Sequence, residues 1–513
     1  MTKVLRPRAV RTGGSVVAVG LTLALGLTAC SAPAKEASQE SRTLAFAIGG
    51  QPSSFDPAQA EVGEAAYIWT GIYDTLLKVD ADGAVKPSAA KSWEYSSDAM
   101  TLTLDLRDGL KFSDGAEVTS EDVAATIERS RTTPGIRVPD LASVKSVDTP
   151  DDHTVVLNLS KPDPALLVNL ATGAGIIAEA KKLGDENLAL DPIGSGPYVL
   201  DKNATVNGST YVLKRRDDYW DLQDYPYKTV TIRVIEDSQA KFNALQAGEL
   251  DAGTASAAQI ATLPEGAFEK KKIEAQAWGG LLFLDRTGSV VPALGDKRVR
   301  EAINMAFDRD LYAKQLMSGG ARATSQFYNP IQSGYDPDLE GYYKHDPEGA
   351  RKLLAEAGYP DGFALTMPSS YFSHTFEPAI TQSLADIGIK VTWESVPPQD
   401  VFPSLSSGKY GMAWYFEGLN SPSIQTRANL QKGGALNPSG YESPELNSLL
   451  SEAAQTTDPD AQGAVYKRIN RYSVENALVA PLVYSSGTWL TKPGVKYLPN
   501  GAVPIYLSNI GAN

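Results

Sequence analysis

The chain has 513 residues, 42% of them hydrophobic, which is enough for more than one domain with a sizeable core. Its formal net charge of −14 argues against nucleic acid as a partner, because nucleic-acid-binding proteins carry basic patches, whereas a diffuse acidic surface usually serves solubility. One cysteine and three histidines offer little material for a metal or thiolate site, so we expect no cofactor and no bound metal.

The N-terminus has the pattern of a secretory signal. Four basic residues come first: Lys3, Arg6, Arg8 and Arg11. An apolar stretch follows from about Val16 to Leu27, and it is interrupted by Gly20 and Gly26. Because this stretch is shorter than the ~20 residues that a membrane span needs, the pattern predicts export rather than an uncleaved transmembrane helix.

The single cysteine, Cys30, ends the run Leu27-Thr28-Ala29-Cys30. This run resembles a bacterial lipobox, in which the thiol receives lipid and the cysteine becomes the new N-terminus. Stable anchoring of a protein by lipid takes more than one chain, at roughly 0.8 kcal/mol per buried methylene. We therefore predict a lipoprotein signal peptide at residues 1–29, lipidation of Cys30, and a flexible tether of small polar residues at 30–41.

Strand and helix signals alternate along the rest of the chain, which predicts the α/β class. Residues 43–48 are expected to form the first strand, and alternating apolar and polar residues at 101–106 and 154–159 predict two half-buried strands. Between these two strands, Thr119 is followed three residues later by Asp122, which is the spacing of a helix-capping box.

Later helices carry equally plain boundary signals. A helix at 238–247 is expected to end at Gly248, since glycine favours the left-handed conformation after a helix. Asp346-Pro347 opens a helix that closes at Gly358, and Ser443-Pro444 opens another. A stripe of Val465, Ile469 and Tyr472 predicts one core-facing side of a further helix.

A series of motifs follows in a fixed order along the chain. The most specific stretch runs through Leu104-Asp105-Leu106-Arg107-Asp108-Gly109, Lys111-Phe112-Ser113-Asp114-Gly115 and Val118-Thr119-Ser120-Glu121-Asp122-Val123. It is followed by Gly194-Ser195-Gly196-Pro197-Tyr198, Tyr219-Trp220, Leu245-Gln246-Ala247-Gly248-Glu249-Leu250-Asp251 and Leu353-Leu354-Ala355-Glu356-Ala357-Gly358-Tyr359. From about residue 43 to about residue 485 the chain resembles family 5 of the bacterial extracellular solute-binding proteins, the peptide, nickel and sugar receptors of ABC importers.

The resemblance implies a two-lobed fold like that of periplasmic binding proteins (type II, cluster C), with an additional small α/β domain. One lobe would use residues 42–78, 195–285 and 489–513, the small domain 79–194, and the second lobe 286–488. Closure of two hinged lobes around a ligand is a recognised switching mode, and the periplasmic binding proteins are a standard example of it.

The implied function is capture of a solute, in the first place an oligopeptide, and its delivery to the permease subunits of an ABC importer. The receptor would be a monomer, would not be an enzyme, and would be held at the outer face of the cell membrane by its lipid anchor. A carbohydrate is the alternative solute within the family. Two other functions stay open: an exported hydrolase, for which no nucleophile motif is present, and a ligand sensor or folding helper with the same fold.

Ligand contacts are expected where the two lobes meet. Glu61 and Gly63 correspond to a segment that lines the cleft of peptide-binding relatives and can pair with a peptide backbone. Trp278 and Gly279 precede an expected strand at 281–284, and a tryptophan beside two glycines suggests a ring held against an open space.

Three further segments complete the predicted site. Trp414, Tyr415, Glu417 and Asn420 match a loop that carries an aspartate for the ligand's amino terminus in peptide receptors. No aspartate is present here, so Glu417 would supply the negative charge, and the aromatic residues could equally stack on a sugar. Strand alternation would turn Tyr415 away from its two neighbours. Tyr371 is a weaker candidate, in a loop after the expected strand 363–367.

Overall fold

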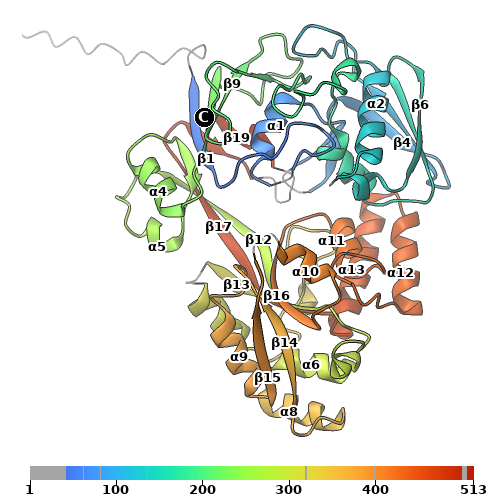
Figure 1. Cartoon of the computed structure of the whole chain (residues 1–513), viewed down its shortest axis with the longest axis vertical. Coiled ribbons are helices and arrows are strands. Elements are labelled where there is room, and N and C mark those ends of the chain that lie inside the picture. The colour runs from blue at the N-terminus through green and yellow to red at the C-terminus, as the bar shows by residue number, and fades with distance from the viewer. Residues whose placement is uncertain are drawn as a thin grey trace, which may run out of the picture.

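The structure, a computed structural model, describes residues 42–61, 63–80, 83–135, 137–317, 320–397, 400–499 and 505–512 (Figure 1). The predicted signal peptide, Cys30 and the tether lie outside these residues. Within the described part of the chain, no helix combines the length and the apolar character that crossing a bilayer requires.

Two long antiparallel strands, β12 (Glu269–Phe283) and β17 (Val479–Thr491), run from the upper to the lower part of the molecule (Figure 1). They belong to a nine-stranded sheet with the order β16-β12-β17-β11-β1-β10-β9-β8, and β13 pairs with β17 beside this path. The other strands of this sheet are β1 (Thr43–Ile48), β8 (Tyr198–Leu200), β9 (Thr210–Arg215), β10 (Thr229–Val234), β11 (Ala252–Thr254), β13 (Ala321–Ala323) and β16 (Met412–Gly418).

The regular pairing of β12 is interrupted where this strand passes from the upper core to the lower ones. Ile273 packs at the edge of the upper core, whereas Ala275 and Trp278 belong to a lower core. The register with β17 shifts between Ile273 and Ala277, and Ala275 adopts a positive φ of 52°. A non-glycine residue in this conformation costs of order 1–3 kcal/mol and persists only where its surroundings enforce it.

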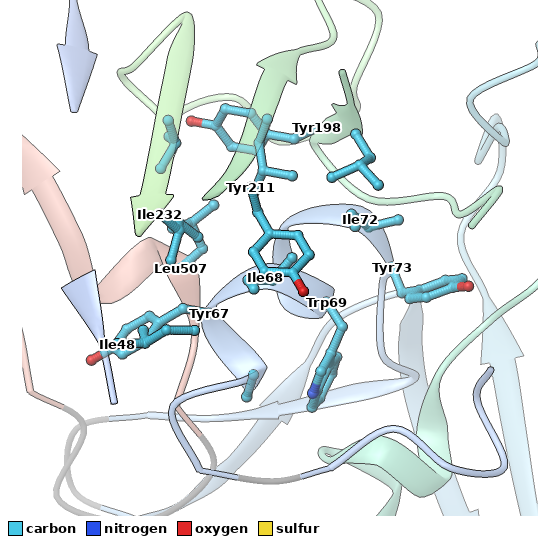
Figure 2. Packing of buried hydrophobic residues seen from close by; sticks show 14 of the residues in the cluster. Ile48, Tyr67, Ile68, Trp69, Ile72, Tyr73, Tyr198, Tyr211, Ile232 and Leu507 are labelled. Carbon is cyan, nitrogen blue, oxygen red and sulfur yellow. The ribbon is translucent and has the colours of Figure 1, made fainter. Parts of the chain in front are cut away.

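The upper lobe is built around α1 (Ala66–Ile72), in which every residue is buried. Figure 2 shows Tyr67, Ile68, Trp69 and Ile72 surrounded by side chains from several strands and from the C-terminal segment, including Tyr198, Tyr211, Ile232 and Leu507. A helix that is apolar on all sides must lie in the core, so α1 holds the N-terminal and C-terminal segments together. The remaining elements of this lobe are α4 (Ser238–Gln246), α5 (Ala257–Ile260), β18 (Val495–Tyr497) and β19 (Ile510–Ala512).

The small domain is a four-stranded antiparallel sheet with the order β4-β5-β7-β6, covered by helices (Figure 1). Its strands are β4 (Ala90–Tyr95), β5 (Thr101–Leu106), β6 (Val144–Asp151) and β7 (Thr154–Leu159), its helices are α2 (Ser120–Thr132) and α3 (Leu166–Leu170), and β2 (Leu77–Val79) pairs with β3 (Val85–Pro87) beside it. The strands predicted at 101–106 and 154–159 are confirmed, as is the capping box of Thr119 and Asp122.

The lower lobe packs helices on both sides of β12, β16 and β17, which gives two cores. One core includes the parallel pair β14 (Phe363–Ser369) and β15 (Ile389–Ser395), with α6 (Lys297–Met305), α8 (Pro347–Glu356) and α9 (Glu377–Ala385). The other core lies beneath α12 (Pro444–Gln455) and α13 (Pro459–Glu475). Shorter helices are α7 (Arg309–Leu311), α10 (Val401–Ser406) and α11 (Pro422–Asn429). The predicted starts at Asp346 and Ser443 are confirmed, because both side chains cap their helices.

Arg216 joins the small domain to the upper lobe. Its guanidinium, 7% exposed, donates hydrogen bonds to the carbonyls of Lys111 and Phe112 at 3.0 and 3.1 Å. It also donates to the carbonyls of Ser195 and Gly196 at 3.3 and 3.2 Å, and it pairs with Asp218. One buried cation therefore satisfies backbone groups from two parts of the molecule.

We expect Arg216→Ala to lower the free energy of unfolding by about 3 kcal/mol, because it leaves several buried carbonyls without a donor. The measurement is urea unfolding followed by circular dichroism. The control is Arg233→Ala, which removes an exposed pair with Glu249 and should change stability by less than about 1 kcal/mol. Equal losses in the two variants would contradict this role for Arg216.

Candidate functional site

Five of the predicted site residues lie on two paired strands rather than in loops. Trp278 and Gly279 are inside β12, and Trp414, Tyr415 and Glu417 are on β16. The register places Trp278 opposite Glu417. The prediction that Trp278 and Gly279 precede a strand and that residues 414–417 form a loop was therefore wrong. Both segments are strands because β12 and β16 pair along seven residues.

The two glycines after Trp278 serve strand packing and do not leave an open space. A Cβ atom at Gly279 would lie 2.3 Å from the ring of Phe416, and one at Gly280 would lie 2.2 Å from the carbonyl oxygen of Ala480. Trp278 itself is buried in the core beneath α12 and α13. The interpretation of its ring as held against an open space was therefore wrong.

The side chains of β16 alternate between the two cores of the lower lobe. Trp414 and Phe416 pack in the core with α6, α8 and α9, while Tyr415 packs against the other core. This confirms that Tyr415 points away from its neighbours. Trp414, 2% exposed, stacks on Phe376 with ring centroids 4.7 Å apart, so its ring is a core residue in this structure.

Glu417 is an ionisable residue on β16, opposite Trp278 of β12. Its carboxylate accepts hydrogen bonds from Trp278 Nε1 at 2.9 Å and from Asn429 Nδ2 at 2.9 and 3.1 Å. No lysine, arginine or histidine among the described residues forms an ion pair with it. Burial raises the pKa of Glu417 to about 7, although the hydrogen bonds from Asn429, Trp278 and Gln425 oppose this shift.

Asn420 is connected to Glu417 through a network of amide side chains. Gln332 donates from Nε2 to the carbonyl of Asn420 and to Oε1 of Gln425. Asn429 donates to the carbonyl of Gln425 at 3.0 Å as well as to Glu417. Sequence reasoning missed Gln332, Gln425 and Asn429, since they carry no motif and are brought together only by the fold.

The structure brings Tyr371 and Tyr415 together in an aromatic cluster of Tyr371, Phe372, Phe402 and Tyr415. The ring of Phe372 lies 4.2 Å from that of Tyr371 and 5.1 Å from that of Tyr415, measured between centroids. Tyr371 and Phe402 are each 53% exposed, so the cluster presents large ring faces to solvent. Tyr415 also lies within electrostatic range of Glu417.

Glu61 and Gly63 lie in the upper lobe, in the segment that precedes α1. The carbonyl of Glu61 accepts a hydrogen bond from Trp69 Nε1 at 2.6 Å, and Gly63 adopts a φ of +88° with open space where a Cβ would stand. Neither residue makes a hydrogen bond to β12 or β16 in the described part of the chain. The two halves of the predicted site are thus on different lobes.

A charged contact joins the lower lobe to the small domain close to the Glu61 segment. Arg427 on α11 pairs with Asp140 at 3.3 Å, and Asp140 also pairs with the buried Arg137 at 3.0 Å. A Cβ at Gly173 would lie 2.8 Å from Arg137 Nη1 and 3.3 Å from the carbonyl of Ala60, which places Arg137 beside the residue before Glu61. Helix α11 therefore contacts Glu417 through Asn429 and the small domain through Arg427.

Residues 84–434 match the family described as bacterial extracellular solute-binding proteins, family 5, middle. The chain belongs to this family. The family match and the solved structures confirm both the predicted family and the predicted two-lobed α/β fold.

Relatives in this family are similar over nearly their whole length. The glutathione-binding protein GsiB of Escherichia coli (strain K12) is 26% identical over 502 residues, covering 93% of this chain and 94% of that protein. The oligopeptide-binding protein OppA of Bacillus subtilis (strain 168) is 24% identical over 544 residues, covering 96% and 98%. The periplasmic binding protein DppA of Helicobacter pylori, solved with the peptide STSA, is 25% identical with a TM-score of 0.76, covering 92% and 98%.

We expect the stability of this family 5 protein to fall as pH rises through the titration of Glu417. Its pKa is raised from 4.5 to about 7 on folding, so the unfolded chain ionises first and stability is lost between about pH 4.5 and 7. Glu417→Gln should remove this loss and be more stable above pH 7 by up to about 3 kcal/mol. Urea unfolding at pH 5 and at pH 8 measures the difference.

The matched control is Glu269→Gln, at an exposed position of β12. It should follow the wild-type protein at both pH values. A Glu417→Gln variant with the same pH dependence as wild type would show that the carboxylate ionises normally in the folded protein.

Proposed function

We propose that this protein binds a peptide between its two lobes and delivers it, unaltered, to the permease of an ABC importer. Membership of the family and the printed names of its glutathione-, oligopeptide- and peptide-binding relatives support a peptide-type solute. The observation that carries the proposal is the carboxylate of Glu417, half-buried and bound only by neutral donors.

A peptide's amino terminus fits this carboxylate chemically. An ionised carboxylate that is removed from water and bound only by amide and indole N–H groups is costly, which is why its pKa rises. An ammonium group would compensate the charge and would act in a partly dry site, where the attraction between opposite charges is stronger than in water. Glu417 would then take the place of the aspartate that peptide receptors carry in the matching loop and that is absent from this loop.

The other predicted site residues would have separate tasks. Glu61 and Gly63 would offer backbone groups to the peptide as an added strand. Tyr371 and Tyr415, with the rest of the aromatic cluster, would contact side chains, and Trp278 with Gly279 would hold the Glu417 carboxylate in place. Trp414 would support β16 from the opposite core, and Asn420 would shape the edge of the site.

Closure of the lobes would centre on β12 and β17. We propose the lobes as residues 42–78, 195–285 and 489–513 on one side and 286–488 on the other, with the small domain at 79–194. The interruption at Ala275, with its positive φ and shifted register, supports a hinge at this level of β12. The ligand would shift the population toward the closed state by binding that state more tightly.

Binding of Ala-Ala-Ala tests the proposal. Because the ammonium stabilises the ionised carboxylate, binding should release a proton and should strengthen as pH rises from 5.5 to 7.5. Titration calorimetry in two buffers of different ionisation enthalpy counts the protons, and small-angle scattering should show compaction. Glu417→Gln and N-acetylation of the peptide should each weaken binding about tenfold or more.

The controls separate peptide from sugar. A carbohydrate is the second candidate, because the exposed rings of Tyr371 and Phe402 could stack on a sugar face. Binding of a neutral oligosaccharide that is unaffected by Glu417→Gln, with no binding of the peptide, would replace our proposal by the carbohydrate receptor. Hydrolysis of either solute by the purified protein would contradict a function limited to transport.

We also propose that the protein is an exported monomer, anchored by lipid at Cys30 to the outer face of the cell membrane. The N-terminal signal pattern supports this localisation. In the producing cells, mass spectrometry should find a lipid-modified Cys30 at the mature N-terminus, and Cys30→Ser should move the protein from the membrane fraction to the soluble one. Unmodified protein that still fractionates with membranes would contradict the anchor.

A further inference from the structure

We propose that a cleft between the small domain and the lower lobe receives a large apolar side chain of the bound peptide and disfavours an acidic one. This inference rests on the proposed peptide-binding function and names the class of peptide that the site selects. The cleft has a volume of about 710 Å³. That volume lies within the usual range of small-molecule sites, about 300–1,000 Å³.

The cleft is built by two parts of the molecule that face each other. One wall comes from β4 and α3 of the small domain, and the other from the start of α11 and the connection between α12 and α13. Figure 1 shows α12 and α13 below the small domain. A side chain held here would contact both parts at once and would therefore favour the arrangement in which they lie together.

The small-domain wall is aromatic and aliphatic. Trp93 and Tyr95 are alternate residues of β4, the edge strand of the sheet, so their side chains share one face, and both are half-buried between exposed neighbours. Leu167 and Val168 of α3 also line the cleft. Large rigid rings beside aliphatic side chains favour an apolar occupant, since burial of apolar surface contributes about 25 cal/mol per Å².

The charges in the cleft disfavour an anion. Among the described residues that line it, Lys86 is the one cation, and it pairs with Asp80 at 3.2 Å. Asp163 also lines the cleft, and its carboxylate accepts hydrogen bonds from Ser143 Oγ at 2.8 Å and from the backbone of Ala165 at 2.9 Å. It has no cationic partner in the described part of the chain, so an acidic side chain would meet a like charge there.

The cleft is close enough to Glu417 for one peptide to reach both. Asn420 and Gln332 line the cleft, and Gln332 donates to Gln425, which together with Asn429 borders the Glu417 carboxylate. One layer of amide side chains thus lies between the proposed position of the amino terminus and the cleft. A peptide anchored at Glu417 would place a later side chain in the cleft.

Variants at Thr457 test this inference without disturbing the cores. Thr457 is exposed, lies in the connection between α12 and α13, and lines the cleft. Thr457→Trp should occupy part of the cleft, and Thr457→Lys should add a second cation. The matched controls are Gln455→Trp and Gln455→Lys, because Gln455 is also exposed and does not line the cleft.

The probes are tetrapeptides of alanine in which one position at a time is replaced by phenylalanine or glutamate. For wild type, phenylalanine at one position should bind about tenfold tighter than glutamate at that position. Thr457→Trp should remove this preference, and Thr457→Lys should reverse it. Both Gln455 variants should behave as wild type.

The outcomes separate the two proposals. If tetra-alanine and all the other peptides fail to bind, the proposed function fails. If peptides bind with the proton release described above but show no preference between phenylalanine and glutamate, or if the Thr457 and Gln455 variants behave alike, the cleft does not select the side chain and this inference is overturned.

Discussion

The pairing of β12 with β17 is the constraint on which the rest of the structure depends. These two strands are shared by the upper sheet and by both lower cores, so they fix the position of the upper lobe relative to the lower one. Their close packing explains the glycines at 279 and 280, because any side chain there would collide with Phe416 or with the backbone of β17. The same pairing carries Trp278 to a position opposite Glu417. A break in it at Ala275, where one core gives way to the next, is therefore a natural place for the lobes to move relative to each other.

Two carboxylates in this protein behave in opposite ways. The carboxylate of Asp285 is bound by the backbone N–H groups of residues 289–291 and by the hydroxyls of Thr287 and Ser289. It is stabilised by these fixed dipoles, and its pKa is accordingly lowered by the backbone hydrogen bonds despite its burial. Glu417 differs, because three side-chain donors do not offset its burial and its pKa rises. A group that the fold leaves under-stabilised is a better candidate for an external cation than one that the fold already satisfies.

Sequence reasoning succeeded where the signal is local or belongs to the family. Asp122 could be placed at a helix start because its spacing from Thr119 determines the cap, and Glu417 could be singled out because an acidic residue stood near the position where relatives carry one. It failed where partners are distant in the chain. Asn429 contacts Glu417, and Gln332 contacts Gln425, only because α11 packs beside β16 in the fold. Likewise, Arg427 of the lower lobe pairs with Asp140 of the small domain. Trp278 was misread for a related reason: a tryptophan beside glycines indicates close packing as readily as open space, and only the position of Phe416 decides between them.

The small domain contacts the lower lobe in a way that its sequence motifs do not predict. The family signature from Leu104 to Val123 builds the sheet and the cap of α2, which is a structural task. Its edge strand β4, however, contributes Trp93 and Tyr95 to the cleft that the small domain shares with the lower lobe, and its Asp140 pairs with Arg427 of α11. The domain is fixed to the upper lobe by the buried guanidinium of Arg216, so in the proposed closure it would move with that lobe and form a wall for the lower lobe. Since part of the other wall is made by connections between helices, whose residues can change without cost to a core, the two proposals together imply that solute selectivity would vary at the cleft while Glu417 stays the same.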